Sequence, residues 1–490
     1  RDTDRSRGLG DVYKRQGCGR SNSSGSGTDP DGNRVFLKKV RKRGTEMKNT
    51  QDLLHGNIKS ELIALTIPLV LGNILQQFYN TIDSFIVGRY VGTEAFAGIG
   101  VAGSIMNLFI FILNGGCNGM SIIFAELYGQ KNYEKLRKES FLSLSAGGGF
   151  TIVLSIVSLL VLYPVLGLIQ TPPEVEPYVV AYLQIIFIGL PATFLYNWCS
   201  AVLRAAGDTE TPLWTLFIAM CMNLALDVAF VPGLHMGTAG TALATVIAQL
   251  FSAGVCLWIM RKKHPIFFFS RKDMGMDLPL LKRTANFGAV SALHQSSIYI
   301  GKMLVQGAVN SGGTEIISAY TATTRIEGFS NSFGDSGSTA ISVFVAQNRG
   351  AGDKKRALKG FHQGLGLMIV FVIILSALQA ALTRGAVQLL MGNPSETVMK
   401  NAVLYMNVVS VFYILNFIGN AGVGFFRGIG KISVPVIGST LHISIRVVLS
   451  YLLIGRMGLE AVAFATGIGW ISVVLYQIVV YRKVRKQEFC

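Results

Sequence analysis

Charged side chains are scarce in this sequence. Only 14% of its 490 residues are Asp, Glu, Lys or Arg, whereas 50% are hydrophobic, and soluble domains carry about 25% charged residues. This composition excludes a series of soluble domains and indicates an integral membrane protein. The six cysteines show no CxxC or Cys/His pairing, which argues against a disulfide framework or a metal site. We expect no cofactor.

Acidic residues are also few, at 27 against 44 Lys and Arg, and the net charge is +17. Such an excess can indicate a nucleic-acid partner, but here most of the basic residues lie between long apolar segments, where membrane topology places them. We therefore expect the lipid bilayer, and no nucleic acid, as a partner. Residues 1–50 are polar and without apolar periodicity, so we expect disorder there. Met47 is a plausible start, and residues 1–46 are set aside from fold reasoning.

Twelve apolar spans follow, each long enough for a membrane helix. Their approximate limits are 62–88, 95–124, 140–166, 178–203, 212–232, 237–260, 285–309, 315–345, 361–384, 399–424, 433–454 and 458–481. The loops alternate between base-rich and nearly base-free. By the positive-inside rule, the base-rich loops and both termini lie in the cytoplasm. The sequence thus predicts a multi-pass protein of the cytoplasmic membrane.

The chain contains an internal repeat. AELYGQKNYEKLRKE at 125–139 matches AQNRGAGDKKRALKG at 346–360, and two further pairs match at nearly the same offset. Because six spans per copy is an even number, both copies enter the membrane in the same direction, as in parallel-repeat transporters. We expect an N-terminal tail at 1–57, lobes at 58–260 and 285–482, a cytoplasmic linker at 261–284 and a C-terminal tail at 483–490.

The first span carries a polar stripe on an apolar helix. Asn73, Gln76, Asn80 and Asp83 recur at steps of three and four residues and so share one face. A carboxylate in hydrocarbon costs about 2.5–3.5 kcal/mol on insertion scales. The stripe should therefore face the protein interior or water, and we expect Gln76 and Asn80 to line a substrate cavity.

Three more polar residues lie at the depth of Asp83. Asn223 and Asp227 are four residues apart in the fifth span, and Thr245 is in the sixth. At 1.5 Å per residue, Asp83, Asp227 and Thr245 all lie about 7–12 Å below the outer surface. Such a cluster can carry a proton or bind Na⁺ through oxygen atoms. The alternative is a structural hydrogen-bond cluster with no ion traffic.

The second copy places bases at related positions. Lys302 aligns with Asp83, and Arg446 aligns with Asn223. We expect these two cations, neutralised by Glu327, to fill the equivalent pocket, so that only the first lobe binds an exchangeable cation. Arg325 and Asp335, in the same span as Glu327, could be a structural pair.

The motifs FYNTIDSFIVGRYVG, VLRAAGDTETP, NLALDVAFV and AQNRGAGD, in this order, resemble those of the multidrug and toxic compound extrusion (MATE) transporters over residues 61–482. The resemblance implies an all-α membrane fold, with twelve helices in two pseudo-symmetric six-helix lobes around a V-shaped cavity. It also implies efflux of cationic or amphipathic drugs driven by Na⁺ or H⁺, with cation coupling at Asp83, Asn223, Asp227 and Thr245. A glutamate found in the seventh span of another branch is absent here.

The sequence therefore predicts a cation-coupled antiporter, not an enzyme, that exports small amphipathic or cationic compounds, and we expect a monomer. The nearest alternative is a lipid-linked oligosaccharide flippase of the same superfamily, which should have a strongly basic cavity. An intramembrane enzyme is disfavoured because the spans contain no HExxH, Ser/His pair or metal cluster. A membrane scaffold would not need paired acids at one depth.

Overall fold

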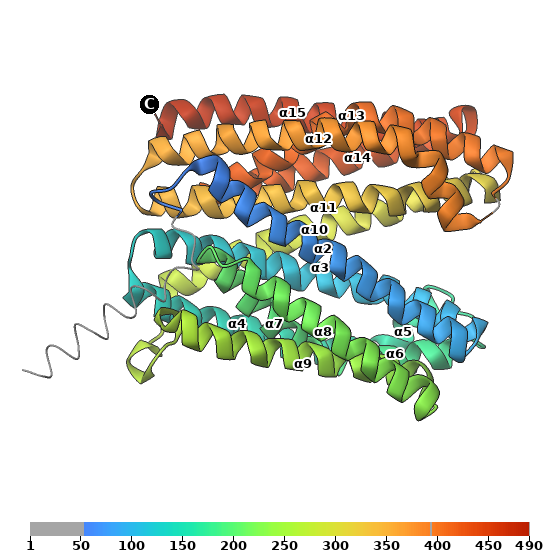
Figure 1. Ribbon diagram of the computed structural model, residues 1–490, viewed down its shortest axis with the longest axis horizontal. Coiled ribbons are helices and arrows are strands. Elements are labelled where there is room, and N and C mark those ends of the chain that lie inside the picture. Colours follow the sequence, from blue (N-terminus) through green and yellow to red (C-terminus); the bar gives the residue numbers. More distant parts are fainter. Residues whose placement is uncertain (1–52, 393, 490) are drawn as a thin grey trace, which may run out of the picture. The chain divides into compact units, whose positions relative to one another are not determined.

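A computed structural model describes residues 53–392 and 394–489, except for the side chains of 79–81, 84 and 93. The regular structure of this part is entirely helical (Figure 1). The first half contains α2 (Ile58–Tyr90), α3 (Thr93–Gly129), α4 (Tyr133–Leu160), α5 (Leu162–Leu168), α6 (Glu176–Ile188), α7 (Leu190–Ala205), α8 (Glu210–Val228), the π-helical turn η2 (Ala229–Gly233) and α9 (Gly237–Lys263).

The second half contains α10 (Leu278–Asn310), α11 (Thr314–Gly350), α12 (Lys354–Met391), α13 (Glu396–Gly428), α14 (Ser433–Met457) and α15 (Leu459–Glu488). Between the halves lie two short 3-10 turns, η3 (Pro265–Phe267) and η4 (Arg271–Asp273). Helix α10 begins well before the predicted span at 285, because the Asp277 side chain accepts a hydrogen bond from the Leu280 amide and caps the first turn.

Each predicted span corresponds to one helix or to two consecutive ones. The fourth is split into α6 and α7, which meet at Gly189 with a bend of 50°, and Pro191 in the first turn of α7 lacks the amide hydrogen that a continuous helix would need. Nine helices of the described part are long and apolar enough to cross a membrane, and this bent pair makes a tenth. Helices α10 and α11 do not meet that composition, because polar residues recur along both.

The repeat is visible in the backbone itself. Four of the five turns in the described first half that contain a residue in the left-handed region have a counterpart 221 or 223 positions later. The pairs are Gly92 and Gly313, Lys131 and Gly352, Gly207 and Gly430, and Gly237 and Gly458. Since turn geometry is copied along with sequence, the two halves are two versions of one six-span lobe.

Helices of the two lobes cross most closely where α3 meets α11. A Cβ atom on Gly129 would overlap the backbone carbonyl of Gln347, and one on Gly350 would overlap that of Glu126. The two contacts are equivalent in the repeat, so the crossing lies on the pseudo-two-fold axis. Gly115 and Gly119 lie in the same way against the backbone of α10.

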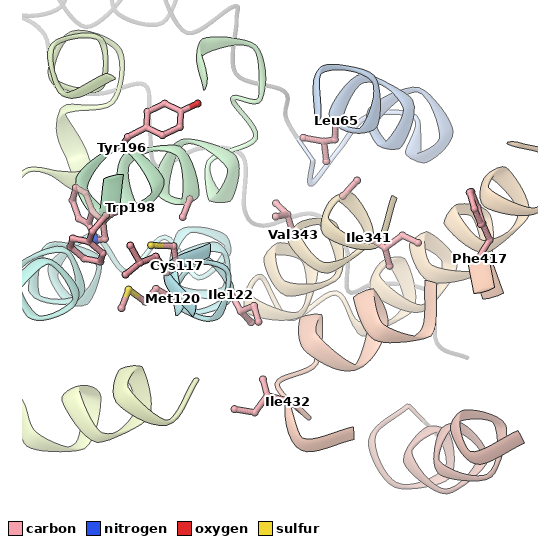
Figure 2. Packing of buried hydrophobic residues seen from close by; sticks show 14 of the residues in the cluster. Leu65, Cys117, Met120, Ile122, Tyr196, Trp198, Ile341, Val343, Phe417 and Ile432 are labelled. Atoms are coloured by element: carbon pink, nitrogen blue, oxygen red, sulfur yellow. The ribbon is translucent and has the colours of Figure 1, made fainter. Parts of the chain in front are cut away.

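Polar contacts reinforce the crossing at the end of the bundle that carries the base-rich loops, here called the basic end. Arg283 of α10 forms an ion pair with Glu126 of α3 at 2.6 Å, and the Gln347 side chain donates to the Ala205 carbonyl at 2.5 Å. Buried side chains of α3, α7, α11 and α13, among them Trp198, Ile341 and Phe417, belong to one hydrophobic core (Figure 2). The lobes are therefore held together firmly at the basic end.

Each lobe also has an ion pair between its fourth connection and the end of its last helix, with the charges exchanged. In the first lobe, Asp208 accepts a hydrogen bond from Thr211 at 2.7 Å and lies 3.4 Å from His264. In the second, Lys431 lies 3.3 Å from Glu488. Burial opposes ionisation of Asp208, but the hydrogen bonds from His264 and Thr211 outweigh it and lower the pKa of its carboxyl.

Candidate cation site in the first lobe and its counterpart

Asp83 lies in α2 with 5% of its surface exposed. Its Oδ2 accepts a hydrogen bond of 3.4 Å from Thr245 of α9, while its Oδ1 is buried without a partner. The structure thus brings Asp83 and Thr245 together, as their equal depth in the sequence predicted. Gln76, two turns earlier in α2, is half-buried. The side chain of Asn80 lies outside the described residues.

Asp227 occupies the last turn of α8 and is completely buried. Its carboxyl group interacts directly with that of Asp83, and neither of its oxygens accepts a hydrogen bond from any described residue. Asn223, one turn earlier on the same face, is 1% exposed, and its side-chain nitrogen is also without a partner. Two ionised carboxylates in contact repel each other, so this arrangement calls for a shared proton or a bound cation.

Two further residues belong to the cluster. Thr241, one turn before Thr245 on α9, is buried with an unpartnered hydroxyl. Tyr182 of α6 lies within electrostatic range of both aspartates, and its hydroxyl contacts the Met106 sulfur at 3.6 Å. Helical spacing from Thr245 could have identified Thr241. Nothing in the sequence around Tyr182 indicates its role.

The cluster has the donor atoms for a small hard cation. Carboxylate, amide and hydroxyl oxygens come from α2, α8 and α9, and such oxygens are preferred ligands of hard metal ions. The π-helical turn η2 follows Asp227 directly and contains Pro232. Because π-helical turns shift the helix register, they often occur at functional sites.

The equivalent region of the second lobe contains the three predicted residues. Arg446 of α14 is half-buried and donates to the Tyr320 hydroxyl at 3.3 Å. Glu327 of α11 interacts electrostatically with Arg446 and with Lys302 of α10. Neither cation forms an N–O contact of 4.0 Å or less with Glu327 among the ion pairs of the described residues. The neutralising role of Glu327 stays a prediction.

Asp335 and Arg427 extend this network. Asp335 interacts electrostatically with Lys302 and with Arg427 of α13, and Arg427 contacts the His294 Nδ1 at 2.8 Å. The proposed pairing of Asp335 with Arg325 has no counterpart among the ion pairs of the described residues. The sequence did not single out Arg427, because it follows an apolar span and looks like a loop base.

A sequence model of the MatE family matches residues 68–229 and, a second time, residues 291–452. The chain belongs to the MatE family. The paired matches coincide with the repeat seen in the backbone, and the predicted fold class, an all-α membrane protein with two lobes, is confirmed for this MATE transporter. A model described as "Lipid II flippase MurJ" also matches residues 172–305.

Curated relatives of this MATE transporter include a "Probable multidrug resistance protein YoeA" of Bacillus subtilis, 28% identical over 63% of this chain and 70% of that protein. A "Probable multidrug resistance protein NorM" of Thermotoga maritima is 25% identical over 78% of this chain and 82% of its own length. A solved structure described as "MATE in the bent conformation" superposes with a TM-score of 0.83 at 19% identity, covering 89% of this chain and 99% of that one. Together they identify a member of a multidrug efflux family.

Proposed function

We propose that this MATE transporter is a Na⁺- or H⁺-coupled antiporter that exports amphipathic and cationic compounds across the cytoplasmic membrane. The observation that carries the proposal is the contact between the Asp83 and Asp227 carboxyl groups. Both are buried, and among the side chains that the structure describes the only hydrogen-bond donor to either of them is the Thr245 hydroxyl at 3.4 Å. In a structural ion pair, a basic side chain would neutralise these carboxylates. Here we assign that role to an exchangeable cation.

The three elements that hold the site couple it to the lobe interface. Helix α2 packs against α8 of its own lobe and against α11 of the other. One contact to α11 is the hydrogen bond from Asn73 to the Ser336 hydroxyl at 3.1 Å. A cation that draws Asp83 toward Asp227 would therefore act on the same helix that touches the second lobe.

In the exchange cycle, the cation enters from outside and binds the two aspartates. Helix α2 then shifts against α11, which changes the substrate surface between the lobes and lowers its affinity for the compound. A ligand can move such an equilibrium only by its different affinity for the two states. The lobes next rock about the glycine crossing, and the cation leaves on the cytoplasmic side.

The orientation follows from charge. Loops at the basic end hold Lys131, Lys263, Arg271 and Lys354, and the positive-inside rule places that end in the cytoplasm together with both termini. We expect the transporter to act as a monomer, because each lobe already has its counterpart within the chain.

A lipid-linked oligosaccharide flippase is the second candidate, favoured by the match of residues 172–305 to the MurJ model. Such a substrate carries a pyrophosphate and calls for a strongly basic path. The spans of the second lobe offer Lys302, Arg325, Arg427 and Arg446, but Glu327 and Asp335 offset part of that charge. Drug export fits this mixed polarity better.

The decisive experiment is ethidium efflux from proteoliposomes in which the Na⁺ and pH gradients are imposed separately. We expect one gradient to drive efflux in the wild type and Asp83→Asn to abolish that dependence. Glu94→Gln, an exposed acid in the same lobe, is the control and should keep it. Gradient-dependent efflux that persists in Asp83→Asn would refute the proposal.

A further inference from the structure

Two cations of the second lobe lie at one level on neighbouring helices. Helices α10 and α14 run side by side in the same direction: the Ser297 hydroxyl is 3.3 Å from that of Ser439, and Gly301 packs directly on Ile443. This register places Lys302 and Arg446 within about two residues of each other along the axis, or about 3 Å.

Lys302 is exposed, yet it does not face lipid. Along α10 its side chain points in the direction of the buried residues Thr284 and Ser291, and away from the exposed apolar stripe formed by Leu293 and Ile300. The side chain also interacts electrostatically with residues of α11 and α14. Its exposed surface therefore lies on the side of α10 that is turned toward α11 and α14.

Asp335 is exposed in the same way on α11. Residues 336–348 of this helix are almost all buried, so the half of α11 toward the basic end has no side that faces lipid. The next residue, Ser336, is hydrogen bonded to Asn73 of α2, which places Asp335 beside the interface between the lobes. Asp335 and Lys302 interact electrostatically but form no N–O contact of 4.0 Å or less among the ion pairs of the described residues.

The other charged groups of this network are engaged or less accessible. Arg446 is bound to Tyr320, Arg427 is bound to His294 and 8% exposed, and Glu327 is half-buried. Of these five residues, only Lys302 and Asp335 are exposed. The ammonium of Lys302 and the carboxylate of Asp335 are thus both accessible at the lobe interface. They interact electrostatically but do not form an ion pair in the described part of the chain.

We propose that Lys302 and Asp335 form a subsite for zwitterionic amphipaths, in which Lys302 binds an anionic group of the transported compound and Asp335 binds its cationic group. This inference rests on the proposed transport function and narrows the class of substrate. A compound with both charges satisfies both side chains, whereas a simple cation leaves the ammonium of Lys302 unpaired in a low-dielectric surrounding, which is costly. The first-lobe aspartates remain free for the coupling ion.

Three xanthene dyes of one size test this subsite. Rhodamine 110 carries a cationic ring system and a carboxylate, rhodamine 123 is its methyl ester and keeps only the cation, and fluorescein keeps only negative charge. Binding is measured by fluorescence polarisation with the purified full chain in micelles of the uncharged detergent dodecyl maltoside. We expect the wild type to bind rhodamine 110 at least about tenfold more tightly than the other two, as a charge-assisted contact requires.

The variants separate the two contacts. Lys302→Gln should lower rhodamine 110 affinity and raise rhodamine 123 affinity, so that the two dyes bind alike, whereas Lys302→Arg should keep the discrimination of the wild type. Asp335→Asn should reduce rhodamine 110 affinity to that of fluorescein. Lys272→Gln, in the linker between the lobes, is the matched control, and melting curves exclude variants that fail to fold.

Equal affinity of the wild type for the three dyes would overturn the proposal, as would equal weakening of both rhodamines by Lys302→Gln. Loss of rhodamine 110 binding when phosphatidylglycerol is added to the detergent micelles would assign the site to a lipid phosphate instead. The assay needs no ion gradient. A transporter with gradient-driven ethidium efflux but no dye discrimination would refute the subsite alone, and discrimination without coupling would refute only the antiport proposal.

Discussion

Replacing Asp227 with Asn tests whether the first-lobe cluster binds a cation. Asp227 is fully buried, and both of its oxygens lack a donor, so the substitution removes a charge and leaves the volume unchanged. Two unit charges about 4 Å apart interact by about 4 kcal/mol at an effective dielectric constant of about 20. Part of this attraction is offset by the cost of dehydrating the carboxylate and the cation. We therefore expect Asp227→Asn to lose about 2 kcal/mol of binding free energy, or about 30-fold in cation affinity.

Thermal unfolding of the purified protein in sodium-free and sodium-containing buffer reads out this loss. At a sodium concentration of about 100 times the Kd, the wild type should gain about 2.7 kcal/mol of stability. A variant with a 30-fold weaker site should gain only about 0.9 kcal/mol under the same conditions. If protons are the coupling ion, the same comparison is made between buffers at alkaline and acidic pH.

Repulsion between the Asp83 and Asp227 carboxylates gives a second prediction, in which the substitution raises the melting temperature. In sodium-free buffer at alkaline pH the two wild-type carboxylates repel each other, so Asp227→Asn should unfold at a higher temperature than the wild type. Glu94→Gln, exposed in the same lobe, should match the wild type in both buffers. An Asp227→Asn protein with an unchanged sodium response and no gain in sodium-free buffer would refute the cation-site reasoning.

Three other substitutions test the surrounding structure. Gly129→Val should push α3 away from the Gln347 carbonyl and cost about 1–3 kcal/mol, measured by melting, while Gly100→Val, where nothing lies within 4 Å, should be neutral; equal melting temperatures would show that the lobes do not meet there. Glu327→Gln should lower the melting temperature but leave ion coupling intact, and altered coupling in the efflux assay would contradict a purely structural role. Asp208 has a lowered pKa, so its stabilisation is present at neutral pH and is lost as the pH falls below about 4; urea titration should show a steeper acid decline for the wild type than for Asp208→Asn, and parallel curves would count against the buried pair with His264.

Much of the architecture could be read from the sequence because membrane helices obey simple rules. Apolar length marked ten of the twelve predicted spans, and copied loop motifs marked the repeat that the left-handed backbone pairs and the two family matches confirm. The grouping of Asp83 with Thr245 and Asp227 was predicted from depth alone. Depth sufficed because a straight helix converts residue number into height.

The sequence could not show how each helix is rotated about its own axis relative to its neighbours. Helical periodicity shows which residues share a face, but not which helix that face meets. Tyr182 beside the aspartates, Arg427 beside His294 and the exposure of Lys302 all depend on how the helices are rotated and paired. The same holds for the glycine crossing, which joins Gly129 to a backbone more than two hundred residues away.

The sequence by itself determined the class of protein, most of its apolar spans, the duplicated lobe and the depth of the Asp83 and Asp227 carboxylates, since these follow from hydropathy and the rise of a helix. Only the tertiary structure decided which charges meet. Among the described residues, Asp83 and Asp227 have no basic partner, and Lys302 and Asp335 are both accessible in the second lobe. Side-chain contacts between helices are set by packing, and no local sequence pattern encodes them.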